Sequence, residues 1–183
     1  MSRLQHPDPI KLLASVLSND IELIGETMET LSQEFGSTDY ISELLPFDYT
    51  DYYGKEMGYS LIRRFVSFEN LVHPGNLPDV KLFTNRVEEQ YTVQERRRVN
   101  IDPGYIAQGH LILATGKRYA HRPYLRKGIY ADLTLIFENR TFKPLEWTYP
   151  DYREHKTIQM LIKIRQKYSI QLADFKREAQ QTQ

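Results

Sequence analysis

A regular alternation of apolar and polar side chains runs over residues 129–138 and restricts this part of the chain to a β-strand. The apolar positions are Ile129, Ala131, Leu133, Leu135 and Phe137. A two-residue repeat is typical of a strand with one buried face, because successive side chains point to opposite sides of a sheet. The segment Glu138-Asn139-Arg140 then favours a turn into a partner strand that ends near Trp147. The pattern predicts an antiparallel hairpin.

Three other segments carry apolar side chains at steps of three and four residues, the repeat of an α-helix with one buried face. These expected helices cover residues 21–35, 78–91 and 153–168. Shorter apolar runs predict strands at residues 11–17, 39–45, 59–68, 111–115 and 121–125. Val99 and Ile101 also alternate with polar residues, and we expect Asp102-Pro103-Gly104 to form the turn that follows them.

The expected order of elements is strand, helix, strand, strand, helix, strand, hairpin and helix. This order predicts an α+β fold with a mostly antiparallel sheet and helices on one face. The first two-thirds predict a ferredoxin-like β-α-β-β-α-β core, to which a C-terminal hairpin and helix are added. A length of 183 residues suits a single domain. We expect residues 1–183 to form it, with flexible ends at 1–9 and 176–183.

The formal net charge is zero, but the charges are unevenly distributed along the chain. Residues 20–60 carry ten acidic side chains and one basic side chain, whereas residues 94–128 carry eight basic and two acidic ones. If the two segments stay apart in the fold, the basic one forms a positive cleft or face that attracts anions. For the acidic one we expect an ordinary solvated face. The neutral total argues against nucleic acid as a partner.

The sequence contains no cysteine, which excludes several chemistries. The protein has no disulfide, no thiolate zinc site, no iron–sulfur cluster and no cysteine nucleophile. The longest apolar runs, such as residues 111–114, are far shorter than the roughly 20 residues of a membrane span. Pro7 and Pro9 interrupt the place where a signal peptide has its apolar segment. We therefore expect a cytoplasmic protein with no membrane partner.

The sequence shows no motif for a phosphate-binding loop or a resident metal. Six residues separate Gly109 from Gly116, where a Walker loop has four, and Arg118 follows the lysine in place of Ser or Thr. The five histidines are not at ligand spacing. An alternative magnesium site would use the oxygen ligands Asp48, Asp51 and Glu56. We assign no metal, and the cofactor stays undefined.

Three short stretches near expected strand ends are rich in side chains that form hydrogen bonds: residues 100–105, 117–124 and 147–153. The candidates for catalysis, in which an aspartate orients the histidine or acts as the base, are Asp102, His121 and Asp151. The candidates for ligand binding, as anion-binding cations or as rings that stack, are Lys117, Arg122, Tyr105, Tyr124, Trp147 and Tyr149. Each of these residues also has a structural interpretation, in a turn or at the rim of the core.

At these stretches the chain resembles a known prokaryotic family, domain-of-unknown-function family 4416, from about residue 8 to residue 170. The matching blocks, in order, are 51–58 (DYYGKEMG), 98–105 (RVNIDPGY), 113–115 (LAT), 121–125 (HRPYL), 128–130 (GIY) and 147–152 (WTYPDY). The resemblance implies one bacterial or archaeal domain and marks the polar blocks. It implies no activity, because the family has no established one.

From these observations we expect the protein to bind a small anionic, phosphate-bearing ligand at a basic, Tyr-rich cleft, with its turnover left open. An alternative is a non-enzymatic protein-interaction module, in which residues 47–53 and 147–153 present Tyr and Trp to a partner. RNA binding through the same bases and rings ranks third, because the net charge is zero. Whether the chain is an enzyme, and its oligomeric state, are not defined by the sequence.

Overall fold

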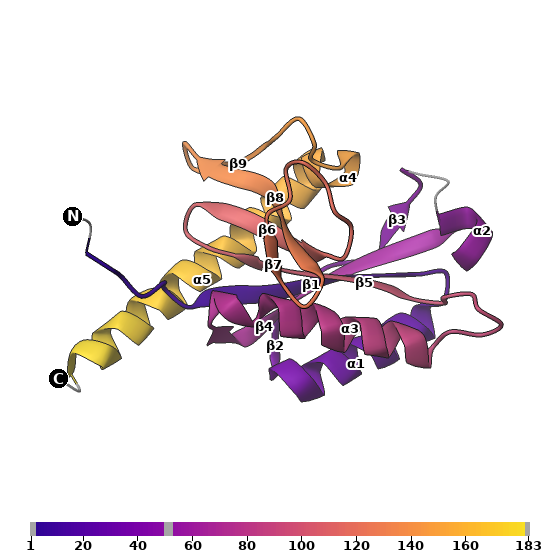
Figure 1. Ribbon diagram of the computed structural model, residues 1–183, viewed down its shortest axis with the longest axis horizontal. Helices are drawn as coiled ribbons and strands as arrows, with labels where there is room; N and C mark the ends of the chain where they lie inside the picture. Colours follow the sequence, from indigo (N-terminus) through magenta and orange to yellow (C-terminus); the bar gives the residue numbers. More distant parts are fainter. Residues whose placement is uncertain (1–2, 50–52, 182–183) are drawn as a thin grey trace.

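In the computed structural model, which describes residues 3–49 and 53–181 apart from the side chain of Lys55, nine strands form one antiparallel sheet (Figure 1). The strands are β1 (Ile10–Ser18), β2 (Thr38–Ile41), β3 (Leu45–Phe47), β4 (Leu61–Val72), β5 (Asn100–Ile106), β6 (His110–Thr115), β7 (Tyr124–Arg126), β8 (Ile129–Glu138) and β9 (Thr141–Pro144). The helices are α1 (Ile21–Phe35), α2 (Gly54–Met57), the short 3-10 helix η2 (Pro74–Asn76), α3 (Leu77–Gln90), α4 (Pro150–Arg153) and α5 (His155–Gln181). The predicted α+β class and mostly antiparallel sheet are confirmed.

The order of strands across the sheet is β2-β4-β1-β5-β6-β8-β7, with β3 paired to β4 and β9 paired to β8. The central strand β1 is buried along its whole length between β4 and β5. Its side chains Leu12, Ala14 and Val16 pack on the face that α1 and α3 cover. Leu13 points to the opposite face. Both faces of the central sheet are therefore apolar, and each needs a covering layer.

The long helix α5 covers this second face, which corrects the expectation that all helices share one face (Figure 1). It packs against Leu13, Phe65 and Ile106 from three central strands. Its own buried apolar side chains are Met160, Leu161, Ile164, Tyr168 and Leu172. The physical reason is that the central strands carry apolar residues at consecutive positions rather than at alternate ones.

The C-terminal helical region is longer than the apolar pattern predicts. The helix expected over residues 153–168 is divided into α4 and α5, and α5 continues to Gln181. Residues 176–181, expected at a flexible end, belong to this helix, and Lys176 Nζ lies 2.8 Å from Asp8 Oδ2. Among the helices in the described ranges, none combines the length and the apolar character that crossing a bilayer requires.

The predicted turn at Asp102-Pro103-Gly104 is wrong, because these residues form the middle of β5. Pro103 lies opposite Ala14 in the register of β1 with β5. A proline has no N–H to donate. A strand therefore tolerates proline at a position where no neighbouring strand needs a hydrogen bond from that N–H. The pairing of β5 with β6 begins only at Gly104, so Pro103 stands on an open edge.

On the N-terminal side of Gly104, β5 and β6 separate, and side chains of α3 take the place of the missing strand. Lys81 Nζ donates to the carbonyl oxygen of Ile101 at 2.8 Å. Glu88 Oε1 accepts a hydrogen bond from the amide nitrogen of the same residue, also at 2.8 Å. Because both backbone groups of Ile101 are satisfied in this way, the sheet can stay open at this point.

A buried ion pair connects the sheet to α5. Lys11 of β1 is fully buried and binds Asp39 of β2, and Gln171 of α5 contacts both side chains. Burial raises the pKa of Asp39, but the hydrogen bonds from Lys11 and Ser67 lower it more, so that its pKa lies below the ordinary value. The negative charge of Asp39 is therefore part of the folded structure.

We expect Asp39→Asn to lower the free energy of unfolding by about 1–3 kcal/mol at neutral pH, because Lys11 keeps an acceptor but loses its counter-charge. Stabilisation by the Asp39 carboxylate is complete above its ordinary pKa of 3.8 and is lost as the pH falls through the lower pKa of the folded state. Denaturant unfolding of variant and wild type should therefore give a difference that shrinks in acid. A difference that does not change with pH would contradict this assignment.

Candidate functional site

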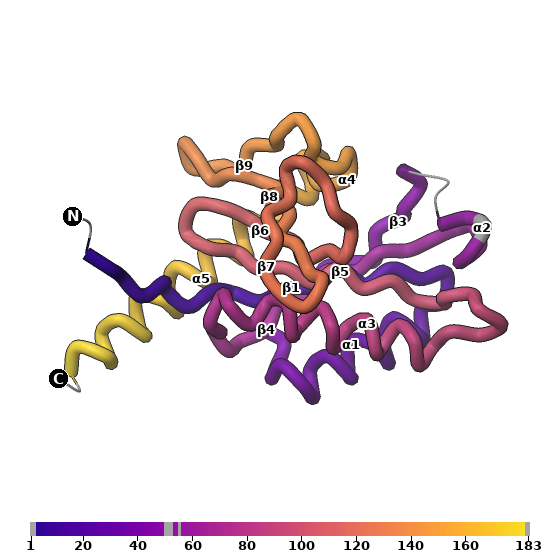
Figure 2. Tube along the Cα trace, viewed as in Figure 1, coloured from indigo at the N-terminus to yellow at the C-terminus, as the bar shows by residue number. Residues whose placement is uncertain are grey.

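A cavity of about 650 Å³ lies where β5 and β6 separate, and we refer to it as the main cavity. Its walls are formed by α3, β5, the end of β6 and α4, together with residues of β3 and β4. Figure 2 shows how β3, β5 and α4, which are far apart in the sequence, come near one another in space. The volume falls within the range of pockets that hold small molecules.

Five of the nine candidate residues from the sequence line the main cavity together: Asp102, Lys117, Arg122, Tyr149 and Asp151. They come from all three polar stretches. Asp102 lies in β5, Lys117 follows β6, and Asp151 lies in the short helix α4. The three stretches therefore meet at one opening of the sheet.

Two candidates, Tyr105 and Tyr124, lie away from the main cavity. Tyr105 is buried in an apolar cluster that includes Leu77, and its ring meets that of His110 edge to face at 5.9 Å. Tyr124 is exposed on the strand β7 and packs against the ring of Tyr130 at 5.2 Å. In both cases the structure places the ring in a packing contact.

His121 and Trp147 stack on each other, with ring centroids 4.7 Å apart, and neither lines the main cavity. Among the described residues, the carboxylate within ion-pair distance of His121 is that of Asp132, at 3.9 Å from Nε2. The hypothesis that Asp102 or Asp151 orients His121 is therefore corrected. The loop before β7 places the imidazole against β8 and Trp147 instead of over β5.

Arg122 links three segments at the wall of the main cavity. Its Nε donates to Asp132 Oδ2 at 2.9 Å, and its Nη1 donates to the carbonyl oxygen of Lys117 at 3.2 Å. Its Nη2 donates to the hydroxyl of Tyr149 at 3.0 Å. The guanidinium thus connects the loop after β6, the strand β8 and the residue before α4, and it holds the wall in shape.

Arg97 closes the cavity from the segment before β5. It binds Glu56 through two hydrogen bonds of 2.6 and 2.7 Å, and it also donates to Glu88 at 3.2 Å and to Asn100 at 3.1 Å. The hydrogen bond from Arg97 lowers the pKa of Glu56, whereas burial raises the pKa of Glu88. These contacts fix the cavity side of α3 to the start of β5.

The main cavity is less basic than the charge distribution in the sequence suggests. Five cationic side chains and four carboxylates line it. Two arginines of the basic segment are paired with acids of the acidic one, Arg97 with Glu56 and Arg98 with Asp20. The two segments meet in the fold at these pairs rather than staying apart, so part of their charge is neutralised. The lining has a small positive excess and is rich in tyrosine: Tyr49, Tyr53, Tyr149 and Tyr152.

Two residues that are not among the sequence candidates carry unpaired donors in this lining. Arg63 of β4 is 6% exposed and binds Asp151 through Nη1, but its Nε has no hydrogen-bond partner in the described part of the chain. Tyr152 of α4 is 3% exposed, and its hydroxyl also lacks such a partner there. Burial raises the pKa of Tyr152, so the hydroxyl stays protonated and can donate.

Aromatic rings surround the guanidinium of Arg63. Its Cζ lies 4.3 Å from the ring centroid of Phe47, 5.5 Å from that of Phe65 and 5.6 Å from that of Tyr152. Burial opposes the charge, but the ion pair with Asp151 helps to outweigh it, and the pKa of Arg63 is raised. Arg63 is therefore a permanent cation with little water around it.

The alternative metal site is not favoured by the placement of its residues. Glu56 is engaged by Arg97, and Asp51 lies outside the described residues. Within residues 3–49 and 53–181, no three His, Asp or Glu side chains come together in a way that could hold a metal ion.

The sheet, its helices on both faces and the opening between β5 and β6 define an α+β protein with a polar cavity of ligand size. The chain belongs to the family described as a domain of unknown function, DUF4416, whose model matches residues 8–168. The resemblance seen in the sequence is thereby confirmed. Neither the curated proteins nor the solved structures contain a match to the chain. Five of the six resembling blocks contribute to the lining of the main cavity: those at residues 51–58, 98–105, 113–115, 121–125 and 147–152.

Proposed function

We propose that the protein binds a small anionic, phosphate-bearing ligand in the main cavity. The observation that carries this proposal is the presence of two unpaired, buried donors in the lining, Arg63 Nε and the hydroxyl of Tyr152. A buried donor without an acceptor costs about 1–3 kcal/mol in a folded protein. An acceptor that enters the cavity from outside the chain would remove this penalty.

A phosphate group suits these donors in charge and in geometry. The N–H groups of arginine bind phosphate oxygens through charge-assisted hydrogen bonds, and a phenol hydroxyl adds a further donor. The rings of Phe47 and Phe65 next to the guanidinium keep water away, and an ionic contact is stronger in such surroundings. Lys117 contributes another cation to the same lining.

Turnover of the ligand, if the site is catalytic, falls to Asp102. Its carboxylate accepts a hydrogen bond from Asn100 Nδ2 at 2.9 Å. In the described part of the chain it is the cavity carboxylate without an ion-pair partner, since Asp132 and Asp151 are held by arginines and Glu88 by Arg97 and Lys81. A carboxylate that is not neutralised is the one that can accept a proton from a bound ligand or water.

A ligand screen tests the proposal directly. The melting temperature of the wild-type protein is measured with inorganic phosphate, nucleoside phosphates and sugar phosphates, each against a chloride control at the same ionic strength. We expect stabilisation that saturates with concentration for at least one phosphate compound. If no compound of the panel shifts the melting temperature, the proposed function is wrong.

Tyr152→Phe is expected to separate binding from stability. The variant loses no hydrogen bond within the described structure, so its free energy of unfolding should equal that of the wild type or exceed it by about 1 kcal/mol. Its affinity for the phosphate ligand should fall about tenfold or more, because a donor to a charged group is removed. Titration calorimetry and denaturant unfolding give the two quantities. The matched control is Tyr59→Phe at an exposed tyrosine outside the cavity, which should change neither.

The two alternative functions depend on the same residues, and their placement favours the ligand. Phe47, Tyr49 and Tyr149, which a protein-interaction surface would present to a partner, line the main cavity. Arg97 and Arg122, which RNA binding would use, are paired with carboxylates. We keep the cytoplasm as the proposed location.

A further inference from the structure

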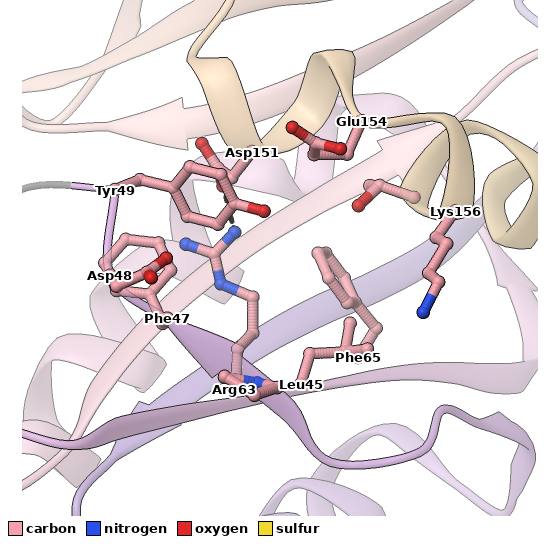
Figure 3. Close-up of a pocket in the computed structure, with 11 residues that line it drawn as sticks. Leu45, Phe47, Asp48, Tyr49, Arg63, Phe65, Asp151, Glu154 and Lys156 are labelled. Atoms are coloured by element: carbon pink, nitrogen blue, oxygen red, sulfur yellow. Dashed lines mark hydrogen bonds and ion pairs between the residues drawn. The ribbon is translucent and has the colours of Figure 1, made fainter.

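A smaller cavity of about 270 Å³ borders the main cavity, and we refer to it as the side cavity. Phe47, Tyr49, Arg63 and Asp151 line both cavities. Figure 3 shows the Arg63 side chain extending from β4 toward Asp151, with Tyr49 and Phe47 near its guanidinium. The ion pair between Arg63 and Asp151 therefore stands at the boundary between the two cavities.

The side cavity has the opposite excess of charge. Two cationic side chains and three carboxylates line it, whereas cations are in excess in the main cavity. The carboxylates are those of Asp48, Asp151 and Glu154. Lys156 lies at the far side of the close-up, with its ammonium group directed away from Tyr49 (Figure 3). Since Arg63 and Asp151 are paired with each other, the excess negative charge of the side cavity comes from Asp48 and Glu154.

Tyr49 lines the side cavity together with the three carboxylates. Burial raises the pKa of the Tyr49 hydroxyl, and the neighbouring carboxylates of Glu154, Asp151 and Asp48 raise it further, against a smaller opposite effect of Arg63. Asp48 and Glu154 are exposed and form no ion pair within the described residues. An aromatic ring between carboxylates favours a cation, because both its π face and the acids attract positive charge.

We propose that the ligand carries an ammonium group in addition to its phosphate, and that the side cavity binds this group between Tyr49, Asp48 and Glu154. The proposal rests on the proposed function, since the phosphate must occupy the main cavity at Arg63 and Tyr152. Arg63 connects the phosphate site with the ammonium site, because it is buried and lines both cavities, and its Nε has no hydrogen-bond partner among the described residues. A zwitterionic ligand places its anion and its cation against the matching excess of charge on each side.

Matched pairs of probes test the ammonium site. O-phosphoethanolamine is compared with 2-hydroxyethyl phosphate, and glucosamine 6-phosphate with glucose 6-phosphate, so that each pair differs in one amine and one hydroxyl. Titration calorimetry on the wild-type chain should show that the amine of at least one pair binds about fivefold to tenfold more tightly. Equal affinities within both pairs would overturn the ammonium site and leave the phosphate site standing. Failure of all four probes together with the wider phosphate panel would overturn both.

The double variant Asp48→Asn/Glu154→Gln identifies the residues responsible. It should reduce the ratio of the affinities for the amine probe and the hydroxyl probe to about one, while the affinity for the hydroxyl probe changes less than twofold. The matched control is Glu146→Gln, an exposed acid of the neighbouring segment that lines neither cavity and should keep the full preference. A preference that survives in the double variant would show that the amine binds elsewhere and would overturn the assignment.

Discussion

Replacement of Arg63 by methionine should lower the free energy of unfolding by about 3–5 kcal/mol. The substitution leaves the carboxylate of Asp151 buried without its cationic partner, and this unpaired charge is the main cost. Methionine has a comparable length and fills irregular space beside Phe47, so the loss of packing is a smaller effect. Denaturant unfolding at neutral pH measures the change.

The double variant Arg63→Met/Asp151→Leu should recover most of this loss. Apolar residues that replace both members of a buried ion pair are often neutral or stabilising, because neither charge then has to be removed from water. A double-mutant cycle should therefore give a large coupling between the two positions. The control cycle uses the exposed pair Lys143 and Glu138, for which we expect less than about 1 kcal/mol. Additive losses at positions 63 and 151 would contradict the interpretation.

The same double variant distinguishes stability from function. It should fold, but it lacks the guanidinium of Arg63, and phosphate compounds that stabilise the wild type should no longer shift its melting temperature. A folded double variant that still binds these compounds would contradict the proposed function. If the fold remains stable without the buried ion pair, stability does not explain why the chain contains this pair. Binding of a ligand that requires the guanidinium is then the better explanation.

The elements with local signals could be predicted from the sequence. The start of α1 is marked by Asp20, whose side chain accepts hydrogen bonds from the amide nitrogens of Glu22 and Leu23. The strand β8 follows from its two-residue alternation, and the turn after it has positive φ at Asn139 and Arg140. The position of α5 could not be predicted in this way, because an apolar strand such as β1 does not specify which helix covers which face.

The residues of the candidate site could also be predicted only in part from the sequence. Polar stretches are visible locally, and five of their residues do line the main cavity. Arg63, however, pairs with a residue 88 positions further along the chain, and its burial follows from the alternation of Arg63 and Arg64 in β4 only once the buried face is known. Tyr105, in contrast, is predicted as a site residue but does not line the main cavity. It lies in β5 three residues after Asp102, so the two side chains point to opposite faces of the sheet.

Residue 104 lies within β5 and not in a turn, so its glycine is required for another reason. A substitution at this position should have the second large effect on stability. Gly104 lies opposite Leu113, at the paired position next to the opening between β5 and β6. A Cβ atom there would approach the carbonyl oxygen of Ile112 more closely than non-bonded atoms allow, and it would lie 2.7 Å from Leu113 Cδ2. The backbone of β6 cannot move away without breaking its pairing with β5 or β8.

Gly104→Ala should therefore lower the free energy of unfolding by about 3 kcal/mol or more, at the upper end of the cost of overpacking. Alanine restricts the unfolded chain and would otherwise stabilise the protein by about 0.4–1 kcal/mol, so the clash must outweigh this gain. The matched control is Gly109→Ala, where a Cβ atom meets nothing within 4 Å and denaturant unfolding should show no loss. If Gly104→Ala is as stable as the wild type, β6 can shift on β5. The opening between these strands would then be adjustable, and the phosphate affinity of that variant should change with it.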